Sequence, residues 1–121
     1  MAAESAEEAL GVLEGRWKLL IIFHLITGGP ALRFSELRRA IAGISQKMLV
    51  QQLKELERDG VLNRRVYLVV PPRVEYSMTE VGKALCPALH ELLQWSDFRR
   101  QALEGRRGAA DPNSRTEQDE L

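Results

Sequence analysis

The sequence predicts a mainly α-helical domain that carries one small β-hairpin. Most of the chain has apolar residues at the spacing of helices. Residues 61–78 are instead rich in β-branched and aromatic residues and are interrupted by a pair of prolines, which is typical of a hairpin with a turn at its tip. Before the hairpin, two helical segments are separated only by a short turn that contains a glycine. This arrangement is a helix-turn-helix.

The first helix is expected over about residues 10–26, after an acidic lead-in over residues 1–10. Its centre, LLIIFHLI, is apolar on nearly every side, which predicts burial in the core or against a second subunit. The sequence Thr27-Gly28-Gly29-Pro30 ends this helix. Helical spacing is kept by Leu13, Trp17, Leu20, Ile21 and Leu25.

The next two helices form the helix-turn-helix. Ser35 is expected to cap a short helix that ends near Ala42, and Gly43-Ile44 makes the turn. Ser45 is a natural N-cap for the following helix, which ends at Gly60. Its inner side is predicted to be an apolar stripe made by Leu49, Leu53 and Leu56.

One sector of this last helix gathers amides, ammonium groups and a methyl surface but no carboxylate. At about 100° per residue, the sector consists of Gln46, Lys47, Val50, Gln51 and Lys54. A merely soluble helix favours acids in its first turn, whereas here the acids come only in the second half. These side chains suit the reading of base edges in the major groove. The competing interpretation is an ordinary solvated face.

The hairpin is followed by a long last helix. Val74, Tyr76 and Met78 alternate with polar residues, as in a half-buried strand. Thr79 is expected to cap a helix over about residues 80–103, with a kink or a restart at Pro87. This helix has more apolar surface than a small domain can cover, which predicts pairing with a second copy of the chain.

Together these elements predict a dimeric winged helix-turn-helix, with the domain at residues 11–104 and a disordered tail at residues 105–121. Charge is segregated: residues 1–15 and 111–121 are acidic, which leaves a net charge of +7 between them and suits a polyanion partner. Residues expected to contact double-stranded DNA are Arg33, Arg38, Ser45, Gln46, Lys47, Val50, Gln51, Lys54, Arg64, Arg65 and Arg73. Residues expected at the homodimer interface are Leu13, Trp17, Leu20, Leu89, Leu92, Leu93 and Trp95.

Several classes of function find no support in the sequence. There is no apolar stretch of about 18 residues or more and no signal-like N-terminus, so a cytoplasmic protein with no membrane partner is expected. The single cysteine, Cys86, excludes an intrachain disulfide. No phosphate-binding loop, metal-ligand cluster or nucleophile–base set is present, so neither an enzyme nor a cofactor is expected.

Three stretches carry a family resemblance: GRWKLLIIFHL, RFSELRRAIAGISQKMLVQQLKELERDGVLNRRVY and VPPRVEYSMTEVGKAL. They resemble the HxlR-type winged-helix transcriptional regulators, relatives of the MarR group, over about residues 13–96. The resemblance implies a homodimer on a pseudo-palindromic operator, with dimer contacts through the first and last helices. It also implies that Ser45, Gln46, Lys47 and Gln51 lie on the recognition helix, Arg33 beside the DNA backbone and Arg73 at the wing.

Two departures from the family pattern limit what the resemblance implies. Many members carry a thiol-sensing cysteine just before the first helix, but the equivalent stretch here, AESAEEALGVLEG, has none. Redox sensing by that route is therefore unsupported. Many members also have threonine where this chain has Val50, which cannot hydrogen-bond to a base.

Other readings remain open at this stage. One alternative is a dimerising scaffold that no longer binds DNA, but such a scaffold would be expected to carry acids or bulky apolar residues on the outer face of residues 46–54, and neither is seen. A second alternative is a sensor for an unknown small-molecule effector. Trp17, Phe23 and Trp95 either line such an effector pocket or pack as ordinary aromatics. Cys86 and His90, four residues apart, either form half of a metal site or simply pack, and His24 is expected in the core or an interface.

Overall fold

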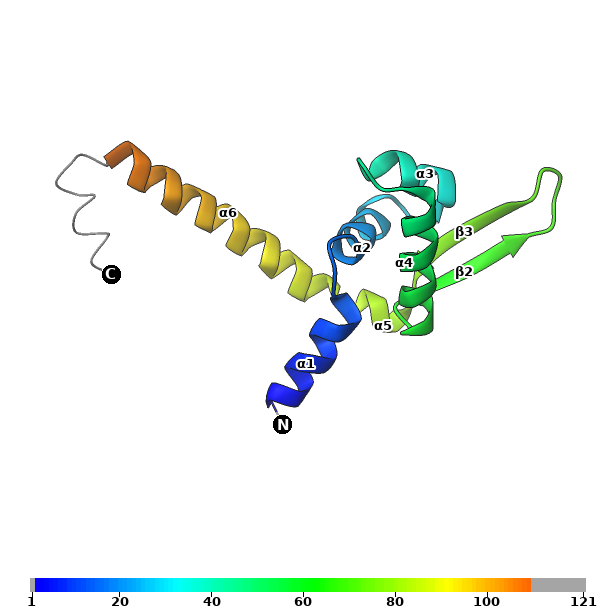
Figure 1. Cartoon of the computed structure of the whole chain (residues 1–121), viewed down its shortest axis with the longest axis horizontal. Coiled ribbons are helices and arrows are strands. Elements are labelled where there is room, and N and C mark those ends of the chain that lie inside the picture. The colour runs from blue at the N-terminus through cyan, green and yellow to red at the C-terminus, as the bar shows by residue number, and fades with distance from the viewer. Residues whose placement is uncertain (1, 110–121) are drawn as a thin grey trace. The chain divides into compact units, whose positions relative to one another are not determined.

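A computed structural model describes residues 2–109 of the chain (Figure 1). The elements are α1 (Ala2–Leu13), α2 (Lys18–Thr27), β1 (Leu32–Arg33), α3 (Phe34–Ala40), α4 (Gln46–Arg58), β2 (Leu62–Tyr67), β3 (Arg73–Met78), α5 (Glu80–Lys83) and α6 (Cys86–Ala109). A helix-turn-helix made by α3 and α4, followed by a hairpin made by β2 and β3, is a winged helix-turn-helix. The predicted mainly helical winged helix-turn-helix is confirmed.

The described chain divides into two compact units. The first ends at Cys86 and contains the winged helix-turn-helix, and the second begins at Pro87 and contains the rest of α6. The tail predicted for residues 105–121 lies outside the described residues from residue 110 onward, whereas α6 continues to Ala109.

The sheet has three antiparallel strands in the order β1-β3-β2, one more than the predicted hairpin. In the hairpin, Leu62 pairs with Met78 and Tyr67 with Arg73. The additional strand β1 pairs Leu32 with Tyr76 and Arg33 with Glu75. The sequence analysis missed β1 because two residues are too few to show the alternation by which a strand is recognised. This strand ties the start of α3 to the wing.

The core of the first unit lies between the helices and the inner face of the sheet. In Figure 1, α4 lies beside β2, and these two elements are in contact, as are α2 and β3. The predicted stripe of α4 is confirmed, since Leu49, Leu53 and Leu56 are at most 1% exposed. The remaining fully buried large side chains are Ile21, Ile22, Leu37 and Leu62.

The continuous helix predicted over residues 10–26 is wrong. The structure has two helices there, because α1 ends at Leu13 and α2 begins at Lys18. Gly15, between them, has a φ of +102°, in a region of backbone conformation that suits glycine and that an α-helix does not contain. The lead-in is helical from Ala2 onward. Apolar spacing alone did not reveal this break, since Leu13 and Trp17 still fit one helical period.

Two of the three predicted helix caps are confirmed. The Ser45 hydroxyl accepts a hydrogen bond from the backbone N–H of Met48 at 3.0 Å, and the Thr79 hydroxyl accepts one from that of Gly82 at 2.9 Å. The Ser35 cap is wrong, because α3 begins at Phe34 and its N-cap is Arg33, two residues before Ser35. There the carboxylate of Glu36 accepts from the backbone N–H of Arg33 at 2.8 Å and satisfies the helix start.

The predicted restart at Pro87 is confirmed. The last helix is divided into α5 and α6, and Pro87 is the second residue of α6. A proline in the first turn of a helix lacks only an N–H that would have no partner within the helix. The division shortens the helix that Thr79 caps to a single turn.

Candidate nucleic-acid interface

The outer face of α4 is exposed as predicted. Gln46, Lys47, Gln51 and Lys54 are exposed, and Val50 is half-buried. Ser45 caps the first turn of α4 through the Met48 N–H, and the N-terminal end of a helix carries a partial positive charge. The first half of this face therefore offers amide and ammonium donors without a carboxylate, a combination suited to phosphates and base edges.

The outer face of α4 forms one wall of an open groove of about 510 Å³, whose other wall is the wing. Val50, Lys54 and Arg64 all line this groove, so a side chain of β2 faces the same space as the outer face of α4. One carboxylate, that of Glu57, also lines it, at the C-terminal end of α4. The groove is completed by Phe34, Gln46, Val74 and Tyr76.

A second hollow, of about 710 Å³, joins α3 to the start of α4. Its polar lining includes Arg38, Arg39 and Gln46. The guanidinium Nη1 of Arg38 donates to Oε1 of Gln46 at 3.3 Å, which brings these two predicted residues together. The sequence analysis did not include Arg39 among the candidates, although its neighbour Arg38 was chosen. On a helix of only seven residues, the spacing of the side chains gave no reason to choose Arg38 over Arg39.

The structure separates the three wing arginines, which the sequence analysis grouped together. Arg64 is paired with Tyr76 and faces the groove beside α4. Arg65 is paired with Glu75, so its side chain lies on the opposite face of the hairpin. Arg73 lies on that face as well, with its Nε 3.4 Å from Oε2 of Glu75. Arg33, at the edge strand β1, is exposed.

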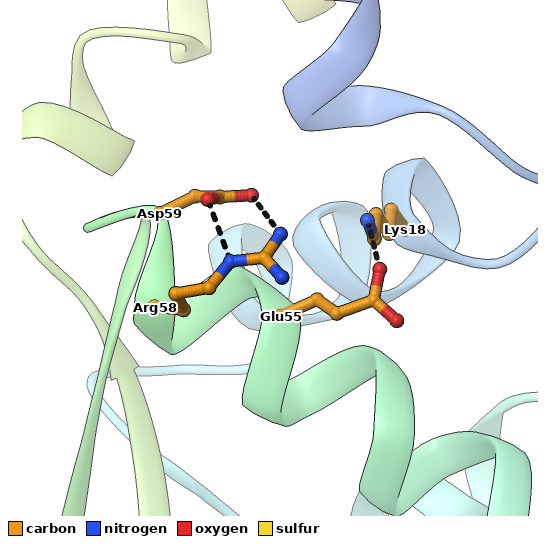
Figure 2. Close-up of polar contacts among 4 residues, drawn as sticks. All are labelled: Lys18, Glu55, Arg58 and Asp59. Atoms are coloured by element: carbon orange, nitrogen blue, oxygen red, sulfur yellow. Dashed lines mark hydrogen bonds and ion pairs between the residues drawn. The ribbon is translucent and has the colours of Figure 1, made fainter.

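Two carboxylates in and next to α4 form ion pairs with basic residues of the protein itself (Figure 2). Lys18 of α2 is 3% exposed, and its Nζ donates to Oε1 of Glu55 at 2.7 Å. At the end of the helix, Asp59 accepts from Nε and Nη2 of Arg58 at 3.1 and 3.2 Å. These pairs neutralise two of the three carboxylates, so α4 presents little negative charge to an anionic partner.

The ion pair between Lys18 and Glu55 makes stability depend on pH. The hydrogen bond from Lys18 is the main cause that holds the pKa of Glu55 below its ordinary value of 4.5. A carboxyl with a lowered folded-state pKa stabilises the fold fully above its unfolded-state pKa, and this contribution is lost as the pH falls through the folded-state pKa. The pair therefore stabilises the fold at neutral pH and ceases to do so in acid.

We expect the Lys18→Met variant to be less stable than the wild type at about pH 7, with a difference that shrinks toward about pH 3. Methionine keeps the length and apolar contacts of the lysine stem but removes the charge. Urea unfolding across this pH range measures the difference. The control is Lys54→Met, because Lys54 is an exposed lysine of the groove. A Lys18→Met difference that stays constant with pH contradicts this account of the pair.

The residues predicted at a dimer interface are mostly accessible in the described single chain. Leu20 is 43% exposed and Trp95 is 59% exposed. Phe98, which was not among the predicted interface residues, is also exposed on α6, at 69%. Leu92 and Leu93 are similarly exposed, whereas Leu13, Trp17 and Leu89 are half-buried.

The other candidate residues do not gather into a site. His24 is half-buried and packs edge-on against Phe23, with the ring centroids 5.4 Å apart. Cys86 is half-buried and His90 is exposed. Among residues 2–109, no three His, Cys, Asp or Glu side chains are grouped in a way that could hold a metal ion. No helix in the described part of the chain is both long and apolar enough to cross a membrane.

Comparisons with known proteins agree with this geometry. The family described as HxlR-like helix-turn-helix matches residues 12–103. The uncharacterized HTH-type transcriptional regulator YybR of Bacillus subtilis is 45% identical over 101 residues, which span 84% of this chain and 79% of YybR. The reduced form of the redox regulator HypR is 44% identical, with a TM-score of 0.76 over 84% of this chain and 98% of HypR. The putative HTH-type regulator YtcD is 47% identical, with a TM-score of 0.75 over 79% of this chain and 96% of YtcD.

Proposed function

This chain belongs to the HxlR-like helix-turn-helix family of transcriptional regulators, and we propose that it acts as a homodimer that binds a two-fold symmetric operator. The family is one of regulators and not of enzymes. The observation that carries the proposal is the outer face of α4. It presents exposed amides and ammonium groups, and its flanks are Arg38 of α3 and Arg64 of β2.

In the proposed complex, the first half of α4 enters the major groove. Gln46, Lys47 and Gln51 read base edges, and Val50 contacts a thymine methyl group. Arg33, Arg38, Lys54 and the backbone at Ser45 set the register on phosphates, and Arg64 does so from the wing. Arg39 joins this group because it lines the same hollow as Arg38. In a dimer, two such helices bind half-sites about 34 Å apart, which is one turn of DNA.

The experiment that tests the function is a titration against an operator that the protein itself has selected from random DNA. Binding to this operator is compared with binding to scrambled DNA at two salt concentrations. We expect a Kd on the order of 10⁻⁸ M or tighter for the operator and weaker, strongly salt-dependent binding to the scrambled sequence. Weak and equal binding to both would instead favour the alternative of a winged-helix scaffold without independent DNA binding.

Gln51→Ala is expected to weaken operator binding by about 1–3 kcal/mol, the range for a bidentate contact to a base. Binding to scrambled DNA should hardly change, because phosphate contacts dominate it. The matched control is Lys54→Ala, which should weaken binding to both DNAs and reduce its salt dependence. If Gln51→Ala weakens binding to the operator and to scrambled DNA equally, Gln51 does not read bases.

Trp95→Glu is expected to shift the protein from dimer to monomer, because it introduces a charge into an exposed apolar surface that we propose to be covered by a second copy. Light scattering coupled to size-exclusion chromatography measures the mass. The control is Gln94→Glu, an equal charge change at an exposed polar neighbour on α6. A wild type that elutes as a monomer at all concentrations contradicts the proposed homodimer.

Regulation by a thiol sensor ahead of α2 is not part of this proposal. HypR is described as a redox regulator, but the first 85 residues of this chain contain no cysteine.

A further inference from the structure

The tip of the wing is apolar and open to solvent. It consists of residues 68–72, Leu-Val-Val-Pro-Pro, which have no charged or hydrogen-bonding side chain. Leu68 is 92% exposed, Val70 is 99% exposed and Val69 is 49% exposed. Contiguous exposed apolar side chains are a feature of surfaces that bind a partner. In Figure 1 the hairpin extends away from the helices of its unit, and this tip is its far end.

Behind the tip, the hairpin is basic on both faces. The register places Arg65, Tyr67, Arg73 and Glu75 on one face and Arg64 on the other. The guanidinium carbons of Arg65 and Arg73 lie 4.8 and 4.6 Å from the centroid of the Tyr67 ring. Both arginines therefore lie against the Tyr67 ring, and the carboxylate of Glu75 neutralises only part of their charge.

The order of these features along the hairpin limits which partner fits. An apolar protein groove accommodates the tip, but it offers no anions to the three arginines behind it. DNA offers both, because its phosphates flank the minor groove and its stacked bases expose apolar faces where a base step is opened. The groove shared by Arg64 and α4 also means that DNA bound along α4 lies against the wing.

Resting on the proposed function, we propose that the tip of the wing enters the minor groove beside the half-site and wedges Leu68 and Val70 against an opened base step, which bends the DNA. Apolar side chains and prolines are used in this way by proteins that bend DNA through the minor groove. Pro71 and Pro72 suit the role, since their fixed φ angles stiffen the tip and they have no N–H to leave without a partner. Arg65 and Arg73 bind the phosphates that the bend brings closer.

The test compares the wild type with the double variant Leu68→Ser and Val70→Ser on the selected operator. Fluorescence resonance energy transfer between labels at the two DNA ends reports the bend. 2-Aminopurine, placed in turn at each step outside the half-site, reports unstacking. For the wild type we expect higher transfer on binding and a bright 2-aminopurine at one step per half-site. For the double variant we expect both signals to fall and the affinity for the operator to drop about tenfold, as the buried apolar area is lost.

The matched control is Val81→Ser, an equally small change at a valine of α5 that is 68% exposed. It should leave both fluorescence signals as in the wild type. Circular dichroism of each variant establishes that the fold is intact, which is expected because the substituted tip residues contribute little to the core.

The outcomes that overturn the proposal are distinct. If the wild type binds its operator without bending or unstacking it, the wedge is wrong and the DNA-binding function stands. If the double variant bends the DNA as the wild type does, the tip serves another partner, such as a protein, and the wedge is again wrong. If the wild type binds no DNA in the selection, both the proposed function and the wedge fail.

Discussion

Leu53→Ala is expected to lower the free energy of unfolding by about 3 kcal/mol, within the range of 2–5 kcal/mol for leucine truncation in a core. Leu53 is 1% exposed and lies on the stripe that holds α4 to the rest of its unit, where α4 contacts β2. Alanine removes apolar contacts and leaves a cavity that the surrounding side chains fill only in part. Urea unfolding at one fixed protein concentration measures the change, since the stability of the proposed dimer would depend on concentration.

The control for this prediction is Gln51→Ala, on the opposite side of the same helix. Gln51 is exposed, so its truncation should change the free energy of unfolding by less than about 0.5 kcal/mol. Within one helix, Leu53→Ala is thus expected to reduce stability, whereas Gln51→Ala is expected to weaken operator binding. A Leu53→Ala loss below about 1 kcal/mol would mean that α4 does not pack as described.

Gly82→Ala is expected to destabilise the fold by about 3 kcal/mol, at the upper end of the usual cost of overpacking. A Cβ at this position would collide with the backbone carbonyl oxygen of Val61 and come within 2.8 Å of Cε of Met78. The Val61 carbonyl has little freedom to move, because it accepts hydrogen bonds from both the backbone N–H and the hydroxyl of Thr79 at 3.1 Å. Thermal or urea unfolding measures the loss.

Two further variants test whether the clash with the Val61 carbonyl causes the loss of stability in Gly82→Ala. Gly11→Ala, in α1, adds a Cβ that meets nothing within 4 Å. It should leave stability unchanged or raise it by up to about 1 kcal/mol, because alanine favours helices more than glycine does. Adding Met78→Ala to Gly82→Ala relieves only the side-chain contact, so stability should not return. Recovery in that double variant would place the clash at Met78 and not at the Val61 carbonyl.

The sequence was most informative where one residue type has one strong structural consequence. Ser45 and Thr79 were identified as caps because few residues can satisfy the free N–H groups of a helix start. The leucine stripe of α4 and the turn at Gly43, which has a φ of +84°, followed from equally local physics. These features position the outer face of α4, so its exposed residues could be predicted from spacing alone.

The remaining features depend on contacts between distant residues, which no local pattern records. No local pattern identified Lys18 as a buried partner in an ion pair, because its partner Glu55 lies 37 positions away. Glycine is common in loops and helices alike, so nothing marked Gly82 as the point of closest approach to the Val61 carbonyl. The wing arginines appeared equivalent until the strand register assigned them to opposite faces.

The division of α4 into a buried stripe and an exposed sector has a consequence for how such regulators diversify. Gln46, Lys47 and Gln51 are exposed, and none of them belongs to the core. If these side chains read the operator as we propose, one copy of a duplicated gene can change them and acquire a new operator while its fold keeps nearly the same stability. Substitutions at Leu49, Leu53 or Leu56 endanger the fold whatever operator is read. Among relatives, we expect the outer positions of this helix to vary with the DNA target and the three leucines to persist.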